Sequence, residues 1–338
     1  MKVNVKANRW FGLLLMLWAT YWFDEVYALI TNNAIQISSF WPVAWIQFMA
    51  PPMFFVTICH FTVPAYRLKK HVLKLSVLPV LYLLFIIIDR LVTADLYYFQ
   101  MLIILINALT HTLLALLRIR KHQINIQKYA SSTHEVNLNW LEYIIIAMVS
   151  LVVGVGIFNL VFFELPLNVF MNAVVFAVVL FITYNALKQK EIFPKDNASF
   201  KTVLDINEEE KGDEPKKQLL PDEKVEEIKL KLNELMRVEA PYLDSELNLI
   251  KLAQLLNVTS HQLSYVINKG HNENFFQFVN RYRVEKAKIM LSDKENEKLS
   301  ILGVAFEAGF SSKTSFNTTF KKMTELTPSE YKKKSSHL

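Results

Sequence analysis

The sequence predicts an all-α protein: a polytopic transmembrane helix bundle of about six spans, followed by a small basic domain of short helices. The first observation behind this prediction is apolar content. Of the 338 residues 52% are hydrophobic, and the mean hydropathy of +0.23 is high for a soluble protein. The second is the scarcity of glycine: seven residues disfavour a turn-rich all-β fold and a glycine-rich phosphate loop. The third is an uneven distribution of charge along the chain.

The net charge of +6 conceals a segregation of charge. Residues 1–198 carry 15 Lys and Arg against 9 Asp and Glu, residues 199–246 carry 8 against 14, and residues 247–338 carry 14 against 8. An apolar basic part is therefore joined through an acidic segment to a small basic domain. The predicted boundaries are 1–188 for the transmembrane domain, 189–222 for an acidic flexible linker and 223–338 for the basic domain.

The sequence patterns that carry catalysis or bind metal are missing from this chain. Cys59 is the single cysteine, which excludes an internal disulfide framework and a cysteine-based zinc site. The chain has no Ser/His/Asp order, no metal-binding histidine pair and no Walker loop. We therefore predict no catalytic residues, no metal and no cofactor, and we expect that the protein is not an enzyme.

Six windows of about 20 mostly apolar residues are long enough to cross a bilayer as helices. The windows are 10–30, 39–61, 72–91, 96–117, 140–163 and 167–187. Asp24 and Glu25 lie near the end of the first window. Pro51 and Pro52 lie inside the second window and predict a kink or a break in that helix.

Basic residues alternate from loop to loop, which predicts the orientation of the spans, because Lys and Arg are retained on the cytoplasmic side. The basic loop residues are Lys2, Lys6 and Arg9, then Arg67, Lys69, Lys70 and Lys74, then Arg118, Arg120, Lys121 and Lys128, and finally Lys188 and Lys190. The other three loops hold one basic residue, Arg90, beside several acidic ones. We expect a multi-pass membrane protein with both termini in the cytoplasm.

Polar residues inside the predicted spans are costly in a bilayer and mark candidate functional positions. Asn107, Thr110 and His111 share one face of the fourth span, while Asn159 and Asn172 lie in the last two spans. They would line a pocket for a ligand or, as the more ordinary alternative, form hydrogen bonds between helices. No acidic ladder or broken repeat indicates a pump or a transporter.

The chain turns polar after the last span, and Pro194, Gly212, Pro215 and Pro221 interrupt it. Its low apolar content predicts a flexible tether. A helix is expected to begin near Asp222, because apolar residues recur from there at intervals of three and four. This helix is either the first helix of the basic domain or a pairing surface between two chains.

Residues 247–270 read as two short helices joined by a tight turn. Asn257 occupies the turn, where the backbone requires a positive φ, and Asn tolerates this better than most residues. Thr259 is expected to cap the second helix, with Gln262 completing a capping box. The outward residues of the second helix, which can bond base edges or phosphates, are Ser260, His261, Gln262, Tyr265 and Lys269.

Residues 304–322 repeat this plan. Gly309 takes the turn, Phe310 fills it, and Ser311 or Ser312 caps the next helix. The candidate DNA-binding residues of this second unit are Ser312, Lys313, Thr314, Asn317, Thr318 and Lys321. One long amphipathic helix is predicted over 273–293 between the two units, and a last helix is predicted to start at Thr327 and Pro328.

Four stretches of this domain carry a resemblance to a known family: "LAQLLNVTSHQLSYVIN", "FVNRYRVEKAKIML", "VAFEAGFSSKTSFNTTFKK" and "LTPSEY". The region 225–334 resembles the DNA-binding domain of the AraC/XylS family of bacterial transcription regulators. The resemblance implies an all-helical domain whose two recognition helices enter successive major grooves of DNA. Asn257 and Glu325 stand where the family commonly has glycine.

The apolar part of the chain also resembles that of the membrane-bound members of this family, which usually has seven spans. The stretch "ANRWFGLLLML" is similar to the start of their second span. We therefore expect that this chain lacks the first span, either by evolution or because its start was assigned too late.

The two parts together predict a membrane-anchored, sequence-specific DNA-binding transcription regulator, with sensing of a signal by the transmembrane domain as a further hypothesis. The resemblance implies that its membrane is the bacterial inner (cytoplasmic) membrane. The expected partners are double-stranded DNA and membrane lipid, with a homodimer, a contact with RNA polymerase and an unknown signal ligand as further candidates. The alternative is a membrane transporter or receptor whose helix-turn-helix tail is regulatory or binds protein.

Overall fold

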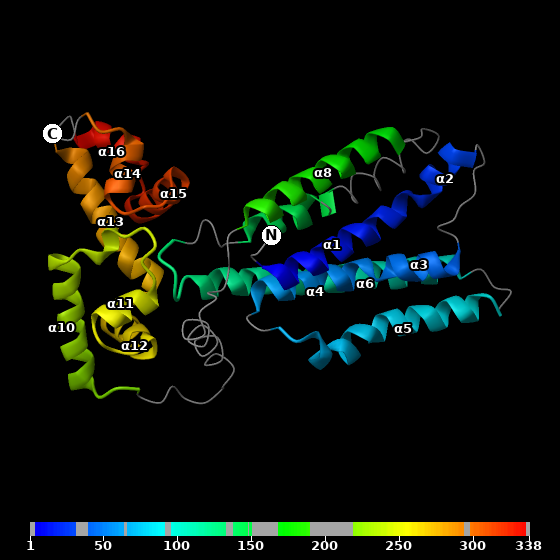
Figure 1. Ribbon diagram of the computed structural model, residues 1–338, viewed down its shortest axis with the longest axis horizontal. Helices are drawn as coiled ribbons and strands as arrows, with labels where there is room; N and C mark the ends of the chain where they lie inside the picture. The colour runs from blue at the N-terminus through cyan, green and yellow to red at the C-terminus, as the bar shows by residue number, and fades with distance from the viewer. Residues whose placement is uncertain are drawn as a thin grey trace. The chain divides into compact units, whose positions relative to one another are not determined.

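The structure is a computed structural model in which all described secondary structure is helical apart from one isolated β-bridge, Ala130 with Asn248 (Figure 1). The residues described are 4–31, 40–63, 66–91, 96–132, 138–147, 149–150, 168–189, 219–293 and 298–335. The chain divides into two compact units. The first consists of Met1–His122 and Leu138–Ile192, and the second consists of Gln123–Asn137 and Phe193–Leu338.

The first unit is built from apolar helices. They are α1 (Val5–Ala19), η1 (Thr20–Trp22), α2 (Phe23–Thr31), α3 (Trp41–Phe48), α4 (Ala50–Thr62), η3 (Leu68–Lys70), α5 (Val72–Asp89), α6 (Tyr97–Ile126) and α8 (Asn168–Lys188). Within the described residues, three helical stretches have the length and composition needed to cross a membrane: Trp41–Thr62, Val72–Asp89 and Tyr98–Ile126.

Three of the six predicted windows, the second, third and fourth, therefore correspond to helical stretches long enough to span a membrane. In the first window the 3₁₀ turn η1 divides the helix into α1 and α2, neither of which reaches the length of a span alone. The fifth window, 140–163, falls mostly on residues that the structure does not describe. In the sixth window the described apolar stretch is the shorter Phe176–Ala186.

The break predicted in the second window is present. Helix α3 ends at Phe48 and α4 begins at Ala50, so that Pro51 and Pro52 fall in the first turn of a new helix, where a missing N–H costs nothing. Pro79 lies inside α5, and the indole nitrogen of Trp45 donates to its carbonyl oxygen at 3.1 Å.

The second unit contains the short helices that the sequence predicts. They are α10 (Asp222–Val238), η5 (Pro241–Leu243), α11 (Leu249–Leu255), α12 (Ser260–His271), α13 (Phe275–Ser292), α14 (Ile301–Glu307), α15 (Lys313–Thr324) and α16 (Pro328–Ser335). Figure 1 shows α13 extending from the α11–α12 pair to the α14–α15 pair.

Helix α10 is the first helix of this unit. It buries Val225, Ile228, Leu232 and Met236, and it packs mainly against α12. Of the two alternatives left open by the sequence, the packing supports an integral helix of the domain. These four apolar residues are buried inside the unit.

Two apolar cores lie at the two ends of α13. The first joins Phe275, Phe278 and Val279 of α13 to residues of α10, α11 and α12. The second joins Val284 and Ala287 of α13 to residues of α14 and α15. Helix α13 therefore connects two helix-turn-helix halves, each with its own core.

Candidate nucleic-acid interface

The first helix-turn-helix unit, α11 with α12, forms as the local sequence requires. Asn257 has a φ of 55°, the left-handed conformation expected at the turn. The hydroxyl of Thr259 accepts from the backbone N–H of Gln262, and the Gln262 side chain accepts from the backbone N–H of Thr259, which completes the predicted capping box. Leu263, Val266 and Ile267 are the buried apolar residues of α12.

The five candidate residues of α12 are not equivalent. Ser260 was expected to face outward, but this first residue of the helix is only 8% exposed. His261 and Tyr265 are half-buried. Gln262 is half-buried and its side-chain oxygen is engaged in the capping box. Lys269 is exposed.

Lys269 is held by an acidic residue from outside its own helix. Its ammonium donates to the carboxylate of Asp222 at the start of α10, and this hydrogen bond raises the pKa of Lys269. The ammonium also lies 5.6 Å from the ring centre of Tyr265. A carboxylate of α10 is therefore paired with the exposed ammonium of α12. The acidic run at 208–214 lies outside the described residues.

The second unit, α14 with α15, repeats this geometry. Gly309 has a φ of 87° at the turn, and Phe310 beside it is 1% exposed. Ser312 is the cap, since its hydroxyl accepts from the backbone N–H of Ser315 at 3.2 Å. Phe316 and Phe320 are fully buried, with their rings 5.4 Å apart.

Helix α15 presents a more open outer face than α12. Lys313, Thr314, Thr318 and Lys321 are exposed. Asn317 is half-buried, and its side-chain oxygen is buried without a hydrogen-bond partner. Two cations and two hydroxyls along one helix can neutralise phosphates and reach base edges.

Arg283 of α13 ties the two halves together. It is 1% exposed, and its guanidinium donates to the carbonyl oxygens of Tyr242 at 2.7 Å and Asp244 at 2.8 Å. Its guanidinium also lies 5.8 Å from the ring centre of Phe310, which is in the turn of the second helix-turn-helix unit. Burial lowers the pKa of Arg283 to about 10, and the nearby charge of Asp244 opposes that shift. A buried cation here is matched by several acceptors.

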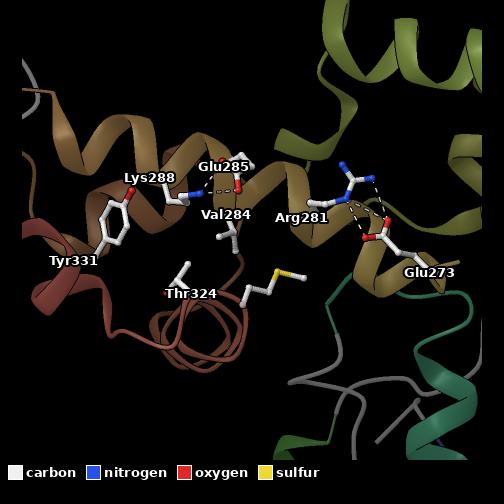
Figure 2. Close-up of a pocket in the computed structure, with 8 residues that line it drawn as sticks. Glu273, Arg281, Val284, Glu285, Lys288, Thr324 and Tyr331 are labelled. Atoms are coloured by element: carbon white, nitrogen blue, oxygen red, sulfur yellow. Dashed lines mark hydrogen bonds and ion pairs between the residues drawn. The ribbon is translucent and has the colours of Figure 1, made fainter. Parts of the chain in front are cut away.

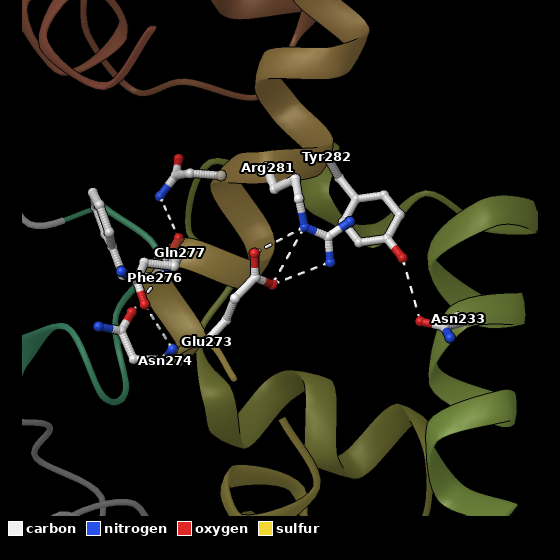
Figure 3. A network of polar contacts seen from close by, with 8 residues as sticks. Asn233, Glu273, Asn274, Phe276, Gln277, Arg281 and Tyr282 are labelled. Atoms are coloured by element: carbon white, nitrogen blue, oxygen red, sulfur yellow. Dashed lines mark hydrogen bonds and ion pairs between the residues drawn. The ribbon is translucent and has the colours of Figure 1, made fainter. Parts of the chain in front are cut away.

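The first turn of α13 is fixed by a second polar network (Figure 3). Asn274 and Gln277 form a capping box. Arg281 pairs with Glu273, with its Nε 2.9 Å from Oε1. The hydroxyl of Tyr282 donates to the side-chain oxygen of Asn233 at 3.4 Å, which joins α13 to α10. These contacts orient α13 relative to the first half.

A cavity of about 540 Å³ lies along α13 (Figure 2). Its lining combines charged residues of α13 with residues of α15 and α16, among them Lys288, Thr324 and Tyr331. Lys288 is paired with Glu285, and Arg281 is paired with Glu273. Because its charges are neutralised in pairs, the cavity has no excess charge to attract a phosphate.

One segment of the second unit was missed by the sequence analysis. Gln123–Asn137, interpreted as part of a loop between two spans, belongs to this unit. Ile126, Tyr129 and Ser131 are buried there, at 0%, 9% and 1% exposure. No local pattern marks such a segment, because the partners of Ser131 lie more than a hundred residues away along the chain.

The polar residues of the first unit separate into two groups. The side chain of Asn107 donates to the carbonyl oxygen of Phe48 at 2.9 Å, which is the interhelical hydrogen bond considered as one alternative. Thr110 and His111 instead line a cavity of about 490 Å³. Asn159 and the side chain of Asn172 lie outside the described residues.

The cavity lined by Thr110 and His111 also has basic side chains in its lining, which come from two helices. Lys74 of α5 and Arg118 and Lys121 of α6 line the same 490 Å³ cavity as Thr110 and His111. Apolar residues of α5 and α6, including Leu78 and Leu114, and Phe55 of α4 also line the cavity. The cavity therefore has a cationic part and an apolar part.

The second unit is similar to known proteins. A family described as "Helix-turn-helix domain" matches residues 252–334. An uncharacterized HTH-type transcriptional regulator of Staphylococcus aureus (strain COL) is 29% identical over 102 residues, which cover 30% of this chain and 13% of that protein. The chain thus matches only a small part of that relative's length.

A solved structure is similar to the same region. It is the C-terminal domain of the two-component response regulator yesN from Fusobacterium nucleatum subsp. nucleatum, at 30% identity, covering 31% of this chain and 96% of that chain with a TM-score of 0.28. Two capped helix pairs joined by one long helix, together with the family match, identify residues 252–334 as a DNA-binding helix-turn-helix domain of the AraC type.

Proposed function

We propose that this protein is a membrane-anchored, sequence-specific transcription regulator whose transmembrane part controls DNA binding by the C-terminal domain. The observation that carries the proposal is the pair of helix-turn-helix units, each with its second helix capped and its hydrophobic face buried. Residues 247–338 carry 14 Lys and Arg against 8 Asp and Glu, so the domain is attracted to phosphate.

The proposed contacts with DNA are made by the outer faces of α12 and α15. Lys313 and Lys321 would neutralise phosphates, while Thr314, Asn317 and Thr318 would contact base edges. On α12 the corresponding residues are His261, Gln262, Tyr265 and Lys269, with Ser260 at the buried start of the helix.

Selection from a random DNA library by the full-length chain in detergent tests this proposal. We expect enrichment of a sequence with two half-sites one helical turn apart. Lys313→Ala and Lys321→Ala should each weaken binding and lower the salt slope by about 1. Lys231→Ala is the matched control, because Lys231 is exposed on α10 and paired with Glu227. Failure to enrich any sequence at low ionic strength contradicts the proposal.

The membrane anchor is proposed to be a bundle of six spans with both termini in the cytoplasm. Three apolar helices of sufficient length and the alternation of basic residues between loops support this topology. A reporter fused after Leu338 should be active in its cytoplasmic form. Activity in the periplasmic form would place the DNA-binding domain on the wrong side of the membrane and refute the proposal.

The signal is proposed to bind in the cavity of the first unit, because its cationic and apolar parts fit an anionic amphiphile. His111→Leu should abolish the response of the target promoter across a panel of growth conditions. Leu113→Ala, an exposed change two residues away on α6, should leave the response intact. An unchanged response in the His111 variant would exclude this cavity as the sensor.

A further inference from the structure

Residues Gln127–Ser132, here named the docking segment, are part of the second unit although the sequence places them between two predicted spans. They directly follow α6, a helix that begins at Tyr97 in the first unit and ends at Ile126 in the second. A turn with hydrogen bonds from the amides of Tyr129 and Ala130 to the carbonyl oxygen of Ile126 connects α6 to the segment.

The docking segment supplies backbone acceptors to the starts of two helices. The carbonyl oxygen of Tyr129 accepts from the N–H of Leu249, the first residue of α11, at 3.0 Å. The carbonyl oxygen of Gln127 accepts from the N–H of Phe276, in the first turn of α13, also at 3.0 Å. The first N–H groups of a helix have no partner inside the helix, so these bonds satisfy donors that the rest of the unit leaves open.

The docking segment also contributes to the apolar core. Ile126, at the end of α6, and Tyr129 belong to the same cluster as Leu249, Leu252 and Phe278. The ring of Tyr129 is buried at 9% exposure, and burial raises the pKa of its hydroxyl. The first core is therefore complete only with this segment in place.

Ser131 connects the docking segment to the residue that joins the two halves. Its carbonyl oxygen accepts from the side-chain amide of Asn280 at 3.0 Å and from Arg283 at 3.3 Å. Its hydroxyl accepts from Arg283 at 3.1 Å and donates to the carbonyl oxygen of Leu247. The docking segment thus supplies some of the hydrogen-bond acceptors that offset the cost of burying the Arg283 guanidinium.

The segment reaches the second half through Ser132. The hydroxyl oxygens of Ser132 and Ser311 lie 2.7 Å apart, within hydrogen-bonding distance. Ser311 directly precedes Ser312, the cap of α15. Six consecutive residues therefore contact the start of α11, the start of α13, Arg283 and the turn before the second recognition helix.

We propose that the docking segment is the element that couples the membrane part to DNA reading, by fixing the two helix-turn-helix halves relative to each other. Because a single hydrogen-bonded turn connects α6 to the segment, a displacement of α6 shifts the acceptors on which α11, α13 and Arg283 depend. This inference rests on the proposed function. The docked segment corresponds to the DNA-binding state, because correct spacing of two recognition helices requires a fixed relation between the halves.

A disulfide trap in the full-length chain tests docking. Ser132→Cys and Ser311→Cys are introduced together, and the native Cys59 is kept because it is buried. After oxidation in native membranes, peptide mapping should find a 132–311 disulfide within one chain. Tyr129→Asp should abolish this disulfide by placing a charge in the core, while Tyr129→Phe should preserve it. A trap that closes equally well in both variants overturns the inference.

DNA affinity supplies the functional readout. Tyr129→Asp should weaken binding of the selected DNA at least tenfold, whereas Tyr129→Phe should stay within twofold of the parent. Hydrogen exchange in α14–α15 checks that the second core stays folded, and Ser131→Ala provides a milder variant with the same direction of change. Equal affinity of the Tyr129→Asp and Tyr129→Phe variants overturns the inference, whereas failure of the parent chain to bind DNA overturns the proposed function instead.

Discussion

A Cβ atom added to Gly309 would lie 2.3 Å from the carbonyl oxygen of Tyr242, a separation that folded proteins do not tolerate. The same carbonyl oxygen accepts a hydrogen bond from Arg283, so it cannot move aside without breaking that contact. The backbone of Gly309 also has a φ of 87°. The turn of the second helix-turn-helix unit therefore requires glycine for two independent reasons.

Gly309→Ala should destabilise the second half by roughly 2 kcal/mol or more, because strain and steric overlap add. The measurement is hydrogen exchange of α14–α15 peptides in the full-length chain, which reports the local free energy of opening. Gly303→Ala is the matched control within α14. Its new Cβ would meet its nearest neighbour at an ordinary 3.5 Å, so this change should stabilise the helix slightly. Equal exchange in the two variants would contradict the prediction.

Glu325→Gly should stabilise the end of α15. Glu325 has a φ of 64°, and a left-handed conformation costs a residue with a side chain roughly 1–2 kcal/mol relative to glycine. Exchange of the C-terminal turn of α15 should slow by a corresponding factor. Glu325→Ala removes the charge but keeps the strain, and so should give no gain. A gain in both variants would point to the charge as the cause.

Phe316→Ala should cost roughly 3–5 kcal/mol, because the side chain is fully buried between Phe310 and Phe320. The loss should appear in exchange of α14 and α15. Met323→Ala on the same helix is the control, since Met323 is 38% exposed. Similar losses in both variants would mean that the second core is not organised around Phe316.

Stability of the first half should fall as the pH drops below about 6.5, the ordinary pKa of histidine. Burial first, and the positive charge of Arg281 second, lower the pKa of His271 in the folded state. An opened state therefore binds a proton at a pH where the folded state does not, and the penalty grows until the folded pKa is reached.

The comparison is between the parent and His271→Gln at pH 8 and pH 5.5. The protection of α12 amides, defined as the intrinsic exchange rate divided by the measured rate at the same pH, should fall more on acidification in the parent than in the variant. An identical loss of protection in the two proteins would show that His271 is not responsible.

Asp222→Asn should strengthen DNA binding by about twofold at low salt, because it releases Lys269 from a competing carboxylate. The gain should disappear as the salt concentration rises, since both partners are exposed. Glu227→Gln on the same helix is the control, because its partner Lys231 lies on α10 rather than on a recognition helix. Titration of the selected DNA by gel shift measures both.

Local rules explain why much of the second unit could be predicted from sequence. A positive φ at Asn257, the box of Thr259 with Gln262, and the start of α16 at Thr327 and Pro328 each depend on residues within four positions of one another. The buried faces followed from spacing alone. The outward position predicted for Ser260 was wrong, because the spacing of apolar residues does not reveal that a small polar residue at the start of a helix is buried.

Other features had no local signature. The role of Arg283 at the junction of the halves and the inclusion of Ser131 depend on contacts between distant residues. In the first unit, hydropathy found windows but not the 3₁₀ turn that divides the first one. Apolar content sets where a helix is favourable, whereas the backbone geometry inside it depends on packing.

The acceptors at Gln127 and Tyr129 meet two different helices from positions two residues apart, and this limits how the connecting stretch can evolve. Loops ordinarily accept insertions, but one added residue here would misalign one of the two bonds. Related sequences should thus keep the number of residues in this stretch unchanged. Genetic screens for mutants that no longer bind the operator should recover substitutions at Ser131, because it contacts Arg283 although it lies 152 positions before it in the chain.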